Sequence, residues 1–387
     1  MYIPYGRQSI VQADIEAVVN VLCSDWLTTG PAVTNFENSV AQYCGGRFAT
    51  AVNSATSALH IAYLAAGLGA GDVLWTTPNT FVATANAALY CEATVEFVDV
   101  DPHTYNMSVD CLAVKLRRAA TQGNLPKIVV PVHFSGQPCE MESIWALSQQ
   151  YGFTVIEDAS HAIGATYGND KVGSCQYSHM VVFSFHPVKI ITTGEGGMVV
   201  TNNAGLHERL NRLRSHGVVR DAGSMTGDSH GDWYYQQLEL GFNYRMTDIQ
   251  AALGHSQLNR IEAFLARRRE IAERYTDELR DLPLVLPSQL PQGKSAWHLY
   301  VVCLDTTKTK KTRKQAFDCL RQKNIGVNVH YIPVHTQPYY QDRFGFRPGD
   351  FPNALLYYET CLSLPMYYGL SDQEQAYVIQ TLQKIFV

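Results

Sequence analysis

One lysine carries the clearest chemical signal in this chain. Lys189 follows the apolar run of residues 180–185 and precedes a glycine cluster at residues 194–197, and Asp158 ends an apolar run upstream. An apolar setting lowers the pKa of a lysine, so that its neutral amine can act as a nucleophile near neutral pH. An aspartate at the end of a buried strand can pair with a cationic ring nitrogen. Together the two residues indicate a Schiff-base lysine for pyridoxal phosphate (PLP) and the acidic partner of the pyridine nitrogen.

The alternative for Lys189 alone is an ordinary surface lysine after a strand, and the neighbouring motifs decide against it. Ser54, Ala55 and Thr56 stand where a short strand meets a helix. The free N–H groups and the dipole at a helix N-terminus make such a junction an anion site. Simple N-capping by Ser54 is the other interpretation.

The elements that must position these residues alternate between apolar strands and amphipathic helices. Continuous apolar runs such as residues 128–133 and 154–157 are typical of parallel strands covered on both faces. The alternation predicts an α/β fold with a largely parallel sheet, right-handed crossovers and ligands beyond the carboxyl ends of the strands. Strands are expected at residues 49–53, 72–77, 94–99, 128–133, 154–157, 180–185 and 197–201, and helices at residues 15–22, 33–43, 56–66 and 81–89.

Downstream the pattern changes. Residues 217–232 are polar and glycine-rich, which indicates a mobile loop, and residues 247–279 have the spacing of long helical structure. A smaller α+β unit follows, with strands expected at residues 298–304 and 326–330, a helix at residues 311–323 and a final helix from residue 371. We therefore predict a large domain over residues 1–255 and a small domain over residues 256–387.

Bulk composition favours a cytoplasmic enzyme of ordinary globular type. The chain has 387 residues, a net charge of −5 and no long apolar run, so that neither a nucleic-acid footprint nor a membrane segment is expected. The nine cysteines are scattered without a Cys-x-x-Cys pair or zinc spacing, and no metal site is predicted.

Seven motifs in order give the chain an end-to-end resemblance to the DegT/DnrJ/EryC1/StrS sugar aminotransferases, which are PLP enzymes of fold type I. They are Trp26-Leu-Thr-Thr-Gly-Pro, Asn53-Ser-Ala-Thr-Ser-Ala-Leu, Thr77-Pro-Asn-Thr-Phe-Val-Ala-Thr-Ala-Asn, Glu157-Asp-Ala-Ser-His, the Lys189 segment, Gly241-Phe-Asn-Tyr-Arg-Met and Val329-His-Tyr-Ile-Pro-Val-His. Within the family the Lys189 segment is most similar to the pseudaminic-acid branch, and the 4-amino-arabinose branch is the main alternative.

The resemblance implies a role for each cofactor residue. It places Ala55 and Thr56, joined by the Ser184 hydroxyl, at the PLP phosphate and Phe81 on the pyridine ring, with Ser54 also among the cofactor-binding residues. Asp158 would pair with the ring nitrogen, His161 would lie beside the ring, and Lys189 would bind PLP and move protons as the cofactor cycles through pyridoxamine phosphate. Asn243 would reach the phosphate of a partner subunit in a homodimer, which makes each active site composite.

The resemblance also implies a substrate pocket for a UDP-linked keto sugar, with L-glutamate and 2-oxoglutarate as the donor pair. Arg245 could bind an anionic group or form a structural ion pair. Retention of Lys189 argues against the PLP-dependent sugar dehydratases, in which a histidine replaces the lysine, and no DNA-binding module is visible for a regulator. The implied substrate residues are Tyr5, Asp25, Trp26, Leu27, Thr28, Ala55, Ser184, Asn243, Arg245, His330, Tyr331, Ile332 and Pro333.

Overall fold

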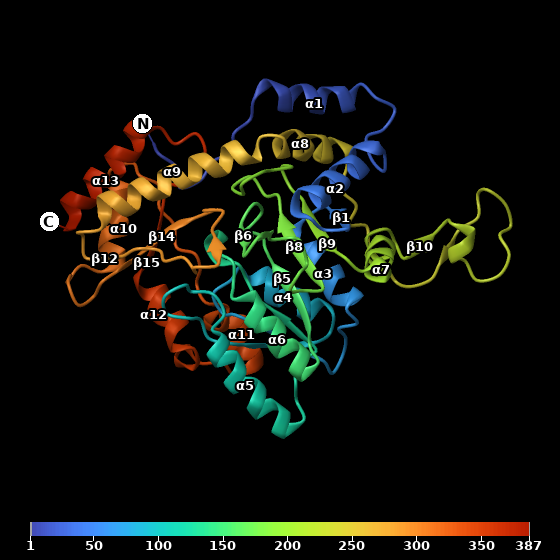
Figure 1. Cartoon of the computed structure of the whole chain (residues 1–387), viewed down its shortest axis with the longest axis horizontal. Coiled ribbons are helices and arrows are strands. Elements are labelled where there is room, and N and C mark those ends of the chain that lie inside the picture. Colours follow the sequence, from blue (N-terminus) through green and yellow to red (C-terminus); the bar gives the residue numbers. More distant parts are fainter. Residues whose placement is uncertain (1, 387) are drawn as a thin grey trace.

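A seven-stranded sheet forms the centre of the larger part of the molecule in a computed structural model that describes residues 2–386 (Figure 1). All neighbouring strands run parallel except β9, which lies antiparallel between β1 and β8. The prediction of a largely parallel α/β sheet is therefore confirmed. In spatial order the strands are β1 (Phe48–Val52), β9 (Gly197–Thr201), β8 (Met180–Ser184), β5 (Thr154–Asp158), β4 (Ile128–Val130), β2 (Val73–Thr76) and β3 (Thr94–Phe97).

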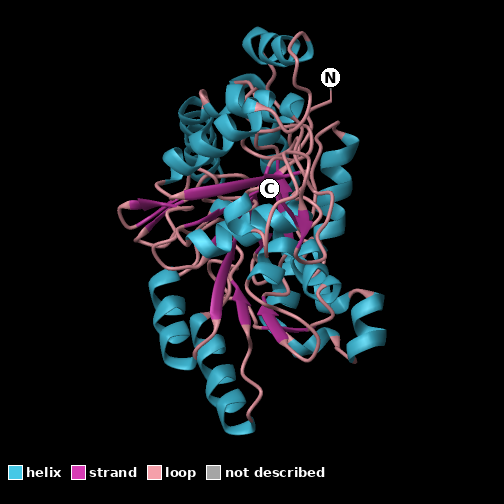
Figure 2. Ribbon diagram, turned by 90° about the vertical axis from the view of Figure 1, so that its right-hand side faces the viewer, coloured by secondary structure: helices cyan, strands magenta, loops and turns pink. Residues whose placement is uncertain are grey.

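Helices cover both faces of this sheet (Figure 2), because its buried strands present apolar side chains alternately to each side. In β8, Val181 and Phe183 belong to one hydrophobic cluster, whereas Met180 and Val182 belong to another. The surrounding helices are α2 (Pro31–Cys44), α3 (Ala55–Ala65), α4 (Val82–Tyr90), α5 (Val109–Gln122), α6 (Met141–Tyr151), α7 (Ala204–Arg214) and α8 (Asp248–Leu258), and α1 (Gln12–Leu22) packs on the outside of α8.

The smaller unit is built on a three-stranded antiparallel sheet in the order β12–β14–β15. The helical stretch predicted for residues 247–279 is divided between α8 and α9. Helix α9 runs from the large core, where Phe264 is buried, to the small core, where Tyr275 is buried. The elements are α9 (Ile261–Leu279), β12 (Leu284–Val285), β14 (Tyr300–Leu304), α10 (Arg313–Gln322), α11 (Pro338–Phe344), α12 (Pro352–Thr360), β15 (Cys361–Leu364) and α13 (Asp372–Phe386).

The strand predicted for residues 326–330 was wrong. Only an isolated bridge joins Asn328 to Ser363 in this segment. The side chain of Asn328 accepts a hydrogen bond from the N–H of Val329 at 2.8 Å, and such local bonds compete with a ladder of strand pairing. The segment is consequently free to turn His330 and Tyr331 toward the large unit.

The first residues of the chain lie with the small unit. Ile3 forms a parallel bridge with Ile325, and the carbonyl of Tyr5 accepts the N–H of Met366 at 3.0 Å. The domain division near residue 255 stays a prediction.

A small three-stranded sheet also joins the two units. In it β13 (Gly293–Lys294) pairs with β6 (Thr166–Tyr167), and β6 pairs with β7 (Asp170–Lys171).

A two-stranded arm leaves the body after α7 and projects from the end of the molecule that carries β1 (Figure 1). It pairs β10 (Val218–Val219) with β11 (Gln236–Gln237), so that the segment predicted as a loop is anchored at its base by strand pairing. Across residues 2–386, no helix is long and apolar enough to cross a membrane.

Candidate active site

A pocket of about 560 Å³ lies beyond the carboxyl ends of the parallel strands, where the two units meet. Its volume is within the range of sites for small molecules and cofactors. The structure brings eleven of the predicted site residues into its walls: Tyr5, Ser54, Ala55, Thr56, Phe81, Asp158, His161, Ser184, Lys189, His330 and Tyr331.

Lys189 stands in the turn that follows β8, at the floor of this pocket. Its N–H donates to the carbonyl of His186 at 2.8 Å, which fixes the turn. Burial lowers the pKa of the Lys189 amine to about 8, although the nearby carboxylate of Asp158 opposes the shift. About a tenth of the amine is therefore neutral at pH 7, far more than for an ordinary lysine, and the neutral form is the one that a nucleophile requires.

Asp158 is delivered to the same pocket as the last residue of β5. Asp158 is only 4% exposed. Each of its carboxylate oxygens accepts a hydrogen bond from another group of the protein. Oδ1 accepts the N–H of Ser160 at 3.1 Å, and Oδ2 accepts the hydroxyl of Thr84 at 2.7 Å. Hydrogen bonds to the charged form stabilise a buried carboxylate, so the geometry holds an anion ready for a cationic partner.

A helix N-terminus forms one end of the pocket. The hydroxyl of Ser54 caps α3 by accepting the N–H of Ser57 at 3.1 Å. The N–H groups of Ala55 and Thr56 bond to no group of the described chain, and both residues line the pocket. Gly197 closes in behind them, where a Cβ would lie 2.5 Å from the carbonyl oxygen of Ser54. Both proposed functions of the Ser54 junction, capping and an anion site, are thus compatible.

Aromatic and imidazole rings form the opposite wall. Phe81, the N-cap residue of α4, is 58% exposed at the pocket, with its ring 6.1 Å from that of Tyr331. The N–H of Ser135 donates to Nδ1 of His161 at 3.2 Å, so that the proton of this imidazole is on Nε2, which donates to the Tyr331 hydroxyl at 3.0 Å. His161 and Tyr331 therefore join the large unit to the small one across the pocket.

Three histidines that line the pocket, His161, His298 and His330, are neutral. Burial, reinforced by the positive charge of Lys189, lowers the pKa of His330 to about 3 and puts that of His161 well below its usual value. The pKa of His298 falls well below its usual value for the same reasons, with His161 contributing before Lys189. The pocket thus offers hydrogen-bonding imidazoles without adding cations beside the amine.

Sequence patterns missed two groups at this site. His298 lines the pocket with its ring 4.4 Å from that of His161, and its buried Nδ1 has no partner within residues 2–386. The carbonyls of Trp297 and His298 are held by the buried guanidinium of Arg268 at 3.0 and 3.1 Å. The second group is Thr84, which belongs to the motif of residues 77–86, where the sequence predicts a role only for Phe81. The other unpredicted wall residues are Leu59, Thr80, Ala83, Val132, Ser160, His186, Val188, Glu195, Asn328 and Val329.

Eight predicted site residues do not line the pocket of their own chain: Asp25, Trp26, Leu27, Thr28, Asn243, Arg245, Ile332 and Pro333. Most of them gather elsewhere. Thr28 bridges Thr247, Asn243 bridges Ser215, and Arg245 Nη1 donates to the Ser215 hydroxyl at 3.0 Å. Trp26 and Leu27 are 54% and 48% exposed, so this group occupies accessible surface beside the end of β1.

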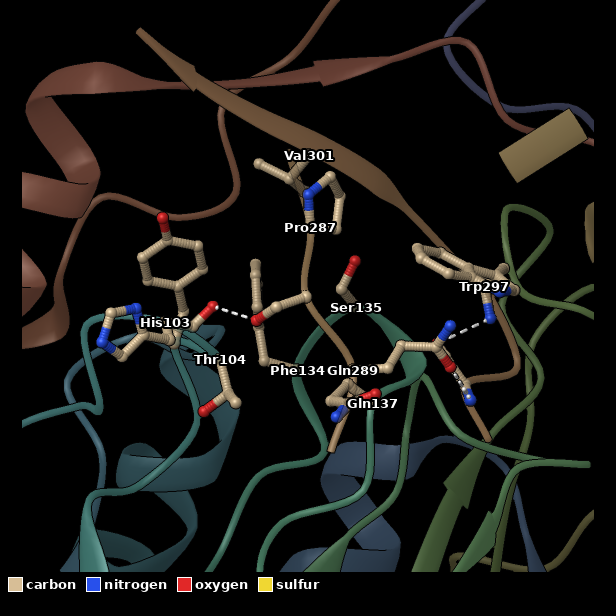
Figure 3. Close-up of a pocket in the computed structure, with 12 residues that line it drawn as sticks. His103, Thr104, Phe134, Ser135, Gln137, Pro287, Gln289, Trp297 and Val301 are labelled. Atoms are coloured by element: carbon tan, nitrogen blue, oxygen red, sulfur yellow. Dashed lines mark hydrogen bonds between the residues drawn. The ribbon is translucent and has the colours of Figure 1, made fainter. Parts of the chain in front are cut away.

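A second, smaller cleft lies between residues 103–105, 134–137 and 287–301 and is shown in Figure 3. It has a volume of about 20 Å³ and is bordered by Phe134, Ser135, Gln137 and Trp297. This volume suits one or two water molecules rather than a metabolite. Because it contains none of the predicted catalytic groups, the larger pocket is the candidate active site.

The residues of the larger pocket fit PLP. Unpartnered N–H groups at the start of α3 and the Ser184 hydroxyl suit a phosphate. Asp158 suits a protonated ring nitrogen, Phe81 presents an open face for a ring, and Lys189 supplies the amine. The donor set matches the chemistry of this cofactor.

Comparison with known proteins agrees with this geometry. The model of the "DegT/DnrJ/EryC1/StrS aminotransferase family" matches residues 8–383. The spore coat polysaccharide biosynthesis protein SpsC of Bacillus subtilis is 42% identical over 386 residues, covering 99% of this chain and 97% of that protein.

Solved structures share the whole fold. Helicobacter pylori PseC, an aminotransferase involved in the biosynthesis of pseudoaminic acid, superposes with a TM-score of 0.90 at 31% identity and covers 100% of this chain and 99% of its own. The PLP form of the putative sugar aminotransferase Spr1654 from Streptococcus pneumoniae gives a TM-score of 0.88 at 26% identity, covering 100% of this chain and 98% of its own.

Proposed function

The chain belongs to the DegT/DnrJ/EryC1/StrS aminotransferase family, and from this premise we propose which amino transfer it performs. It is a PLP-dependent sugar aminotransferase. The proposed reaction moves the amino group of L-glutamate to C4 of a UDP-linked 4-keto-6-deoxy-N-acetylhexosamine, as a UDP-4-amino-4,6-dideoxy-N-acetyl-β-L-altrosamine transaminase would. The observation that supports this substrate is the end-to-end similarity to PseC at a TM-score of 0.90.

The residues of the pocket divide the proposed chemistry among them. When bound, PLP supplies an electron sink for the carbon that loses its proton. Lys189, with its pKa near 8, is the group that can accept this proton and return it to a neighbouring carbon. Asp158 holds a proton on the ring nitrogen, and the N–H groups of Ala55 and Thr56 hold the phosphate. His161 and Tyr331 form a wall of the substrate pocket.

The charge of the pocket argues for a second subunit. Lys189 is the one lysine or arginine among the residues that line it, yet PLP, the sugar diphosphate and glutamate are all anionic. We infer that the exposed group containing Trp26, Thr28, Asn243 and Arg245 enters the pocket of a partner in a homodimer. Each site would then receive cationic and polar groups that its own chain does not place there.

The test is the visible spectrum of the purified protein. L-Glutamate alone should bleach the band of bound PLP, and a UDP-linked 4-keto sugar should restore it. The UDP-linked 4-keto-6-deoxy-N-acetylhexosamine should restore the band faster than UDP-4-keto-arabinose or a UDP-linked 3-keto sugar. A band that no amino donor changes would contradict aminotransferase activity, whereas faster restoration by another sugar would replace the substrate and leave the reaction in place.

A further inference from the structure

A chain of hydroxyl groups leads from the start of α4 to Asp158. The Thr80 and Thr84 hydroxyls are 2.8 Å apart, and the Thr84 hydroxyl lies 2.7 Å from Oδ2 of Asp158. Thr80 and Thr84 are 2% and 1% exposed. Both threonines belong to the motif of residues 77–86, and the proposed function gives neither of them a role.

The direction of each hydrogen bond follows from the acceptor at its end. An ionised carboxylate can only accept, so Thr84 must donate its proton to Asp158. The Thr84 oxygen is then free to accept, and Thr80 must be the donor in the bond between the two threonines. The two hydroxyl protons therefore point in one direction, toward Asp158.

The conformation of Thr84 supports a specific role. A threonine inside a helix commonly directs its hydroxyl to a carbonyl one turn earlier. The Thr84 hydroxyl instead leaves the helix and donates to a residue 74 positions away in the sequence. The backbone of Thr84 is fixed independently, because its carbonyl accepts the hydroxyl of Tyr63 at 3.1 Å. Removal of the hydroxyl should therefore leave the helix in place.

We propose that Thr84, supported by Thr80, is a positioning residue for the cofactor: it holds the Asp158 carboxylate oriented toward the ring nitrogen of PLP. With Ser160 N–H on Oδ1 and Thr84 on Oδ2, each oxygen keeps a fixed donor and retains lone pairs for the ligand. Loss of the Thr84 bond would leave a buried carboxylate with one donor fewer and free to rotate.

The experiment compares Thr84→Val, which keeps the shape of the side chain, with Thr84→Ser, which keeps the hydroxyl. The dissociation constant of PLP is measured by titration of the apoprotein, together with the pH dependence of the bound-PLP absorption. Because Thr84→Val releases the carboxylate that faces the ring nitrogen, we expect a dissociation constant about ten-fold higher for this variant, which corresponds to about 1.4 kcal/mol. Thr84→Ser should stay within about two-fold to three-fold of the unmodified protein, and the KM for the sugar should change little in either variant.

Two outcomes would overturn the proposal. One is a PLP affinity of Thr84→Val equal to that of the unmodified protein, and the other is an equal loss in Thr84→Ser, which would show that the hydroxyl is not the cause. Thr80→Val gives an independent reading if Thr84→Val fails to fold. It should weaken PLP binding by a smaller factor in the same direction, and unchanged binding in this variant would also refute the role.

Discussion

His161 of the large unit and Tyr331 of the small unit are joined by a hydrogen bond of 3.0 Å whose direction is set by a third group, the backbone N–H of Ser135. Because His161 must donate, the Tyr331 oxygen is the acceptor and its own proton is available to the pocket. Burial also raises the pKa of Tyr331 above its usual value, so the phenol remains protonated. The hydrogen bond from His161 to Tyr331 thus joins the two units at the wall of the site, with a fixed donor and a fixed acceptor.

This pair makes a prediction for stability. Tyr331→Phe leaves the buried Nε2–H of His161 without an acceptor, and an unsatisfied buried donor costs about 1–3 kcal/mol. We expect the midpoint of thermal unfolding to fall accordingly. Tyr339→Phe is the control, since Tyr339 is 52% exposed and its hydroxyl accepts only from Arg343 at 2.9 Å. Equal unfolding midpoints in the two variants would contradict the directed bond.

A second prediction concerns Lys189 itself. Lys189→Ala and Lys189→Arg should abolish turnover, because neither side chain offers a neutral amine near neutral pH. Steady-state assays with glutamate and the keto sugar measure the effect, and Lys127→Arg at the surface should retain full activity. Turnover in either Lys189 variant near that of the unmodified protein would remove the residue from the mechanism.

The lowered pKa of Lys189 predicts a pH dependence. The neutral amine increases as pH rises through about 8, so the rate at which the apoprotein takes up PLP should rise through this pH and then level off. Asp158 opposes the lowered pKa, and Asp158→Asn should therefore move the midpoint to lower pH. Stopped-flow measurement of uptake between pH 6 and pH 10 (roughly two units on either side of the midpoint) tests both. A midpoint at higher pH in Asp158→Asn would contradict the expected effect of the Asp158 charge on the pKa of Lys189.

Two adjacent arginines of α9 predict opposite outcomes. The Arg268 guanidinium is 3% exposed and donates to the carbonyls of Trp297, His298 and Met366. Arg268→Met removes these bonds and should destabilise the fold by about 3 kcal/mol. Arg269→Met, at an exposed position, should change stability by less than about 0.5 kcal/mol. Urea unfolding measures the stability of both variants. Similar losses of stability would contradict the role of the Arg268 hydrogen bonds.

The composite site predicts complementation. Lys189→Ala and Asn243→Ala subunits should each be inactive as homodimers, and mixing them should restore part of the activity. In a mixed dimer one site combines an intact Lys189 with the intact Asn243 of the other subunit. A Lys189→Ala, Asn243→Ala double variant mixed with itself is the control. Mixed dimers, verified by mass, that stay inactive would place Asn243 in the site of its own chain, and an active Asn243→Ala homodimer would place it outside catalysis.

Sequence patterns predicted the strands and turns that deliver Asp158 and Lys189, because buried parallel strands leave continuous apolar runs and their carboxyl ends meet at one edge. They could not locate His298, since its place in the pocket depends on the turn at Trp297 (φ 50°) and on Arg268, thirty positions away. The strand predicted for residues 326–330 failed for a local reason, the Asn328 side chain. Thr84 was visible within its motif, but nothing along the chain indicates that its hydroxyl faces Asp158.

The pairing of Ile3 with Ile325, and of Tyr5 with Met366, has a consequence for biosynthesis. Tyr5 leaves the ribosome well before Met366, the residue that holds it, because most of the sequence lies between the two. The large sheet can therefore form on the nascent chain while the Tyr5 wall of the pocket is still missing. The pocket wall at Tyr5 is completed late, when residues 3–5 pair with Ile325 and Met366.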